Sequence, residues 1–137
     1  MRGDPLHKYQ AEYLGGISRS FPVMTYIEYP KRKNDITDFL DVFIELGPFQ
    51  LAIEIETTRR HLLDNARKAH ALGIPVWFVV PTRKLRTQAL KMLKPLNLRP
   101  GGQAIKVFLL APAAKELKDL LSSIILANNG GLANKKI

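Results

Sequence analysis

The sequence predicts a mixed α/β fold in which one central sheet is flanked by helices. Two observations support this: strand-like segments rich in β-branched and aromatic residues, and amphipathic helical segments that separate the later strands. The order of elements fits an antiparallel meander followed by βαβ crossovers. At 137 residues and 46% hydrophobic content, we expect one domain over residues 1–127, with residues 128–137 as a mobile tail.

The first part of the chain is predicted to form a helix and then a strand. Residues 7–16 have helical character and end in two glycines. The inward contacts of this helix are expected to be Tyr9, Tyr13 and Leu14. Residues 23–29 are rich in β-branched and aromatic side chains and precede a proline, which is typical of a strand. Residues 31–35, which begin with three basic side chains, are expected to form an exposed turn.

The next two strands are predicted to form a hairpin. Residues 41–46 and residues 51–57 are mostly apolar, and four residues separate them. Those four residues, 47–50, begin with a glycine and a proline and are interpreted as the hairpin loop. This loop length decides which residues of the two strands lie opposite each other.

Three acidic residues lie on this hairpin, where buried strands should carry none. With the four-residue loop, Asp41 lies opposite Glu56, and Phe43 lies opposite Glu54. Alternate residues of a strand face the same side, so the three carboxylates share one face of the sheet. Clustering like charges costs free energy, and a hard divalent cation is the usual relief. The pattern therefore indicates a metal site.

The rest of the chain alternates between helices and strands. A helix over residues 59–72 is expected to be capped by Thr57 or Thr58 and to end at Gly73. Residues 76–80 form a continuous apolar run between two prolines, as expected of a central strand covered on both faces. The remaining predicted elements are helices over residues 83–96 and 113–126 and a strand over residues 105–110.

These elements and acids together resemble the PD-(D/E)xK superfamily of restriction endonuclease-like nucleases. The core of that family is a helix, three antiparallel strands, a helix and a further strand. Its motif is an acid at the start of the second strand, followed by Glu-x-Lys on the third. Asp41 matches the first acid and Glu54 the second, whereas Glu56 stands where the pattern has lysine. Members with Glu-x-Glu are known, and the resemblance covers roughly residues 12–110.

The resemblance implies hydrolysis of phosphodiester bonds, with Mg²⁺ or Mn²⁺ as the cofactor. Asp41 and Glu54 are the implied metal ligands. The backbone carbonyl of Ile55 is a natural additional ligand, and Glu12 loosely matches an acid that family members often supply from the first helix. The core of the fold is then expected to be restriction endonuclease-like.

The missing lysine leaves its catalytic role to other residues. Glu56 is a candidate for the general base or for a further metal ligand. Lys68 or Arg60, from the following helix, is the candidate substitute for the lysine. Asp35 and Asp38 compete with Asp41 for the role of the first acid, although Asp38 has the wrong parity and Asp35 falls in an expected turn.

The charge of the chain favours a polyanionic partner. There are 21 Lys+Arg against 12 Asp+Glu, a formal net charge of +9, so DNA is the expected substrate. The candidate nucleic-acid-binding residues are Lys31, Arg32, Lys33, Arg59, Arg60, Arg83 and Lys84. A homodimer is expected because cutting two strands generally needs two active sites. The chain has no cysteine, which excludes disulfides, thiolate zinc sites and a cysteine nucleophile.

No apolar run has the length of a signal peptide or a membrane span. We therefore expect a soluble, intracellular (cytoplasmic) protein with no membrane partner. Two other functions stay open. The first is a nucleic-acid-binding module of the same fold without catalysis, motivated by the missing lysine. The second is a protein-interaction domain of a mobile element or virus, in which the positive charge serves solubility. Independently of these, the alternative to a metal site is that Glu54 and Glu56 are solvent-facing strand residues paired with Arg59 or Arg60.

Overall fold

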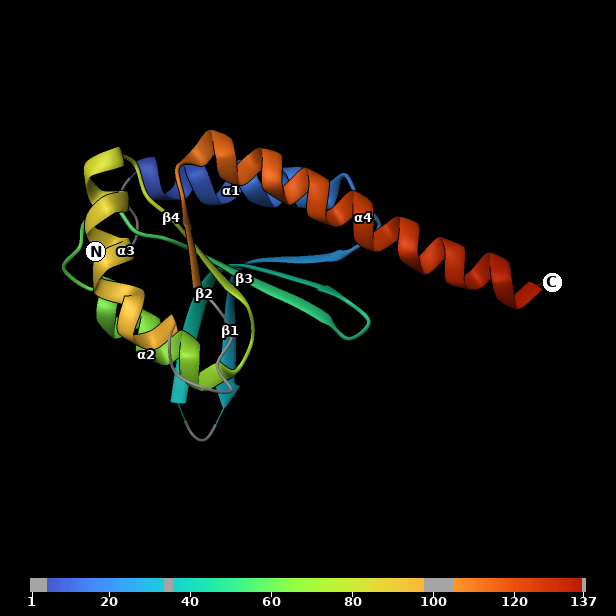
Figure 1. Ribbon diagram of the computed structural model, residues 1–137, viewed down its shortest axis with the longest axis horizontal. Coiled ribbons are helices and arrows are strands. Elements are labelled where there is room, and N and C mark those ends of the chain that lie inside the picture. Colours follow the sequence, from blue (N-terminus) through green and yellow to red (C-terminus); the bar gives the residue numbers. More distant parts are fainter. Residues whose placement is uncertain (1–4, 34–35, 98–104, 137) are drawn as a thin grey trace.

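The computed structural model describes residues 5–33, 36–97 and 105–136, with the backbone alone at 29–33, 36–40, 72 and 128–136. The predicted fold class is confirmed: the strands form one five-stranded mixed sheet in the order β1-β2-β3-β4-β5 (Figure 1). The first three strands form an antiparallel meander, and β3, β4 and β5 are parallel. The strands are β1 Met24–Lys33, β2 Ile36–Leu46, β3 Phe49–Ile55, β4 Val76–Val79 and β5 Ile105–Phe108.

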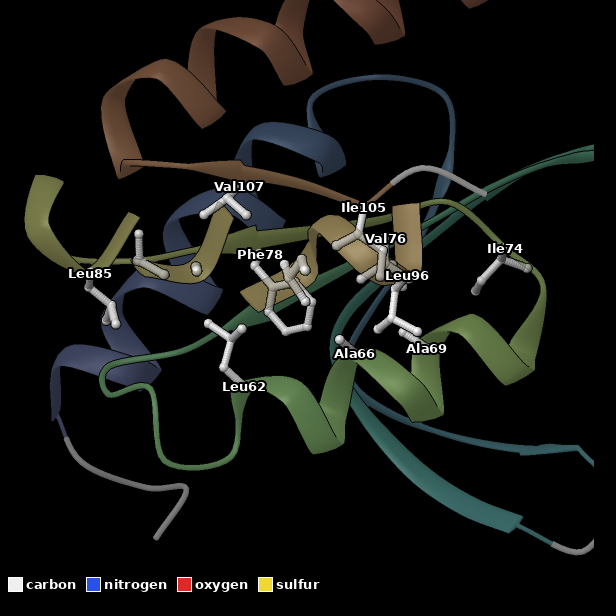
Figure 2. Packing of buried hydrophobic residues seen from close by; sticks show 14 of the residues in the cluster. Leu62, Ala66, Ala69, Ile74, Val76, Phe78, Leu85, Leu96, Ile105 and Val107 are labelled. Atoms are coloured by element: carbon white, nitrogen blue, oxygen red, sulfur yellow. The ribbon is translucent and has the colours of Figure 1, made fainter. Parts of the chain in front are cut away.

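The four helices cover the two faces of the sheet in pairs (Figure 1). They are α1 Pro5–Arg19, α2 Leu62–Leu72, α3 Arg83–Asn97 and α4 Leu110–Lys136. Central strand β4 alternates between the two layers, with Phe78 in the core beneath α2 and α3 and Trp77 in the core beneath α1 and α4. In Figure 2, Leu62 and Ala66 of α2 lie beside the Phe78 ring. Burial on both faces explains the unbroken apolar run of this strand.

Helix α1 continues through the glycine pair that was expected to end it. A Cβ atom at Gly15 would lie 2.7 Å from Cδ1 of Ile27 on β1, closer than real Cβ contacts allow. Gly15 therefore serves the close approach of α1 to the sheet and not the end of the helix. At Gly16, an added Cβ would meet nothing within 4 Å.

This difference between the two glycines gives a matched pair of variants. Alanine improves helix propensity equally at both positions, by about 1 kcal/mol. At Gly15 the added methyl also displaces the end of the Ile27 side chain, a flexible group, so we expect a cost of about 1 kcal/mol, the low end of the range for overpacking. We expect Gly15→Ala to be less stable than Gly16→Ala by about that amount in urea unfolding. Equal stability of the two variants would show that α1 does not pack this tightly against β1.

The orientation of α1 differs from the predicted one at its two tyrosines. Leu14 is buried as expected, but Tyr9 and Tyr13 are 59% and 42% exposed. Their rings stack on each other in the open, with centroids 6.1 Å apart. The side of α1 that packs on the sheet is formed by His7, Gln10, Ala11, Leu14, Gly15 and Ser18. The prediction failed because it took the aromatic residues as the buried face, whereas small and polar residues occupy it.

The turn between β2 and β3 has two residues and not four. Leu46 pairs with Phe49, and Gly47 between them has a φ of 57°, as the first central residue of a type II′ turn requires. Phe43 consequently lies opposite Ala52, so the predicted pairing with Glu54 was wrong. The error came from counting two strand residues as loop. Because the register moves by two, each side chain still points to the predicted face.

Several element boundaries also differ from the predicted ones. Strand β1 extends to Lys33, so residues 31–33 belong to a strand and not to a turn. Helix α2 begins at Leu62, and His61 at its N-cap makes no side-chain capping bond, so the expected threonine cap was wrong. The predicted end at Gly73 is confirmed: its φ is 71°, and its N–H donates to the carbonyl of His70.

The last helix is much longer than expected. It was predicted over residues 113–126, but α4 spans Leu110–Lys136, so residues 128–136, expected as a mobile tail, are helical. Ala113, Leu117 and Leu121 of this helix are buried in the core beneath α1 and α4. Within the described ranges, no helix is both long enough and apolar enough to cross a membrane.

Candidate functional site

The three acids of the β2–β3 hairpin are all buried. Asp41, Glu54 and Glu56 are 1%, 4% and 7% exposed. Val42 and Ile53 form the last pair of the β2–β3 register, and Glu54 has the parity of Ala52, which lies in the core beneath α2 and α3. Glu56 follows β3 directly and has the same parity as Glu54. Because Asp41 lies one residue beyond the paired region, the common face of all three acids stays a prediction.

Asp41 lies at the point where β2 separates from β3. Beyond this residue, β2 continues to pair with β1 only, and the two strands run away from β3 (Figure 1). In place of a further strand partner, the backbone N–H of Ile55 donates to Oδ2 of Asp41 at 2.7 Å. The register position of Glu28 is opposite Asp41, and Glu28 has a φ of 58°, which is uncommon for a residue other than glycine. The Asp41 carboxylate thus closes the end of the β2–β3 ladder.

The second oxygen of Asp41 meets a histidine from the opposite helix layer. Nε2 of His7, on α1, lies 3.0 Å from Oδ1 of Asp41, and His7 is 4% exposed. The distance is that of an ion pair, but the contact does not have hydrogen-bond geometry. His7 places imidazole next to a buried carboxylate, where a positive charge would offset the cost of burying a negative one.

Glu56 lies at the edge of a pocket of about 450 Å³ beside the end of β3. Nδ2 of Asn65, on α2, donates to Oε1 of Glu56 at 2.5 Å, and the N–H of Glu56 donates to the carbonyl of Val79. Lys68 lines the same pocket one helical turn after Asn65. The pocket is lined by His7, Ile55, Glu56, Thr57, Thr58, Arg60, His61, Asp64, Asn65 and Lys68. It therefore combines a buried carboxylate with several basic side chains.

The predicted lysine substitutes, Lys68 and Arg60, both line this pocket. Nζ of Lys68 lies 4.0 Å from Oδ2 of Asp64, an exposed pair whose contribution to stability is small. Glu12, in contrast, is exposed on the side of α1 that turns away from the sheet. The structure does not bring Glu12 to the other acids.

The predicted nucleic-acid-binding residues lie in different places. Arg59 and Lys84 line a second pocket, next to the first. Arg83 is exposed at the start of α3 and lines neither pocket. The structure does not describe the side chains of three predicted binding residues, Lys31, Arg32 and Lys33, or that of the competing acid Asp38. Asp35 lies outside the described residues entirely.

Asp41 and Glu54 are both carboxylates, the kind of donor that a hard divalent cation prefers. Magnesium usually binds one or two carboxylates, completing its shell with water and substrate phosphates. Among the described residues, no group of three or more His, Asp or Glu side chains is placed to hold a metal ion. The fit is therefore to a two-carboxylate site, without Glu12.

Sequence reasoning missed two residues of this site, His7 and Asn65. The helical spacing of His7, Ala11, Leu14 and Ser18 would have placed it on the buried face of α1. Nothing in the sequence near Asn65 signals its bond to Glu56, because that bond depends on how α2 packs beside β3.

The fold and site define an α/β protein with a mixed five-stranded sheet and buried acids at the carboxyl end of a central strand. Among solved structures, the chain is similar to a protein of unknown function named AF1548, with a TM-score of 0.50 and 16% sequence identity. The match covers 73% of this chain and 56% of AF1548, so the chain spans little more than half of that protein's length. At this identity the similarity concerns the fold alone. Comparison with protein-family models and with curated proteins gives no match.

Proposed function

We propose that the protein is a metal-dependent nuclease of the PD-(D/E)xK type that hydrolyses phosphodiester bonds in DNA. The observation that carries the proposal is the burial of Asp41, Glu54 and Glu56, the last of which lines a pocket together with Lys68 and Arg60. Buried carboxylates cost free energy and are unusual where only stability is at stake. The net charge of +9 supports a polyanionic substrate.

In this proposal, Asp41 and Glu54 hold Mg²⁺ and their burial keeps both carboxylates oriented. When bound, the ion supplies a Lewis acid for the phosphoryl oxygen and lowers the pKa of a water molecule. The bond from Asn65 would orient Glu56, whose carboxylate would accept the proton of the attacking water. Water adds to phosphorus, the ester P–O bond breaks, and the leaving oxygen takes a proton from solvent. Lys68 places positive charge near the phosphate, the role of the family's lysine.

The test is cleavage of labelled DNA by the purified protein in Mg²⁺, in Mn²⁺ and in EDTA. Substrates should include linear duplexes, single strands, and branched or flapped duplexes, because the sequence gives no preferred structure. We expect products with either metal and none in EDTA. Binding of these DNAs without cleavage of any of them, in either metal, would reject the nuclease.

A second candidate, a nucleic-acid-binding module without catalysis, is favoured by one specific observation. Both oxygens of Asp41 already have partners within the protein, Ile55 and His7, which gives this acid a structural role. The presence of Glu56 where the family has lysine also favours a module without catalysis. The cleavage assay separates the two candidates, since the module would bind DNA equally well with and without metal.

A further inference from the structure

A second pocket, of about 350 Å³, lies next to the candidate site and is not used by the proposed chemistry. It forms where β3 and β4 end and α3 begins, at the same end of the molecule as the start of α2 (Figure 1). Its lining is Thr57, Thr58, Arg59, Pro81, Thr82, Lys84, Leu85 and Gln88. Ligands of open α/β sheets commonly bind at the carboxyl ends of the strands.

The polar groups that line this pocket are mainly hydrogen-bond donors and cations. Arg59 and Lys84 supply positive charge, three threonines supply hydroxyls, and no acidic side chain is among the lining residues. Within the described part of the chain, neither Arg59 nor Lys84 has an ion-pair partner. Oγ1 of Thr82 accepts the N–H of Leu85 at 3.1 Å, which fixes the hydroxyl and leaves its own proton to donate. This chemistry suits an anion.

The two pockets are adjacent, because Thr57 and Thr58 line both. They differ in charge: Glu56 and Asp64 lie in the first pocket together with basic residues, whereas the second contains only cations among its ionisable groups. A polymer with a regular series of phosphates could therefore have one phosphate in the first pocket and the next in the second. The threonine pair would lie beneath the link between them.

We propose that the second pocket is a phosphate-binding subsite, in which Arg59 and Lys84 hold the backbone phosphate of the nucleotide adjacent to the one in the first pocket. This assignment rests on the proposed function in one respect only, namely that the first pocket holds the phosphate that is cleaved. The binding of a nucleic-acid phosphate by Arg59 and Lys84 is independent of catalysis. The backbone of the substrate then crosses the ends of β3 and β4 from one pocket to the other.

The experiment measures DNA binding in EDTA, where cleavage does not occur. A fluorescein-labelled 20-base-pair duplex is titrated with wild type and with the double variant Arg59→Ala/Lys84→Ala by fluorescence anisotropy, at several salt concentrations. Each lost phosphate contact reduces the slope of log K against log [salt] by about 0.9, so the variant should lose about 2 in slope. Its affinity at 0.1 M salt should fall roughly tenfold for each cation removed.

The matched control is Lys91→Ala/Lys94→Ala, which removes the same charge from exposed positions further along α3, outside both pockets. It should lose less than half of the slope that the pocket variant loses. Equal losses in the two variants would overturn the proposal, because a general positive field would then explain binding. An unchanged slope in the pocket variant would overturn it as well. Thermal unfolding of both variants checks that each remains folded.

The outcome is separate from that of the cleavage assay. If wild type cuts no DNA and the pocket variant still shows the larger loss of slope, the nuclease is rejected and the phosphate-binding pocket is supported. If wild type cuts DNA and both double variants bind alike, the nuclease stands and the subsite is rejected.

Discussion

Replacing Glu54 with glutamine should abolish metal-dependent cleavage while DNA binding is retained. Glutamine has nearly the shape of glutamate, so it can occupy the buried position, but it removes a charge that the proposed metal site needs. Because a metal ion contributes several kcal/mol to such a transition state, we expect the rate to fall at least about a hundredfold. Single-turnover cleavage in Mg²⁺ measures the rate, and anisotropy in EDTA measures binding.

The control for this variant is Glu45→Gln on the same hairpin. Glu45 lies near the turn, away from the pocket, and accepts a hydrogen bond from Gln50 at 3.1 Å. Like Glu54→Gln, this replacement removes one negative charge and keeps the shape of the side chain. Cleavage should continue at the wild-type rate in Glu45→Gln. Full activity of Glu54→Gln would remove Glu54 from the mechanism.

The largest effect on stability is expected at Phe78. Its ring is fully buried, it pairs with Glu54 across β3 and β4, and Leu62 of α2 lies beside it (Figure 2). Truncation of such a residue to alanine typically costs about 3–5 kcal/mol, from lost burial and from the cavity left behind. Urea unfolding should show this loss as a lower midpoint. Because Phe78 supports the helix that bears Asn65, any remaining folded protein should also cleave more slowly.

Leu90→Ala provides the comparison for Phe78→Ala. Leu90 lies on α3 and is 39% exposed, so its truncation should cost less than about 1 kcal/mol. A similar loss of stability in both variants would mean that the core beneath α2 and α3 is not the main source of stability.

The order of elements and the identity of the core residues could be predicted from local patterns. The two-faced burial of β4 follows from its unbroken apolar run, and the end of α2 follows from Gly73. The buried residues of α3 follow from helical periodicity. These features depend on residues close together in sequence, which is why a single sequence was enough to predict them.

The features that failed depend on contacts between distant segments. The glycine pair of α1 predicts a helix end from the local sequence. Only the close approach of Gly15 to Ile27 explains why glycine is present within the helix. The number of residues in the β2–β3 turn is decided by tertiary packing, since both a two-residue and a four-residue turn give the same faces. His7 and Asp41 are thirty-four positions apart, and only the packing of α1 against the end of the sheet brings them together. No local pattern contains that information.

The bond between Ile55 and Asp41 makes one amide a natural spectroscopic probe of the site. The N–H of Ile55 donates to Oδ2 of a side chain, whereas the N–H of the next residue, Glu56, donates to the backbone carbonyl of Val79. Capture of a cation by Asp41 withdraws electron density from that oxygen. The ¹⁵N–¹H resonance of Ile55 should consequently move when Mg²⁺ is titrated into the protein, and should do so without any substrate or label at the carboxylate.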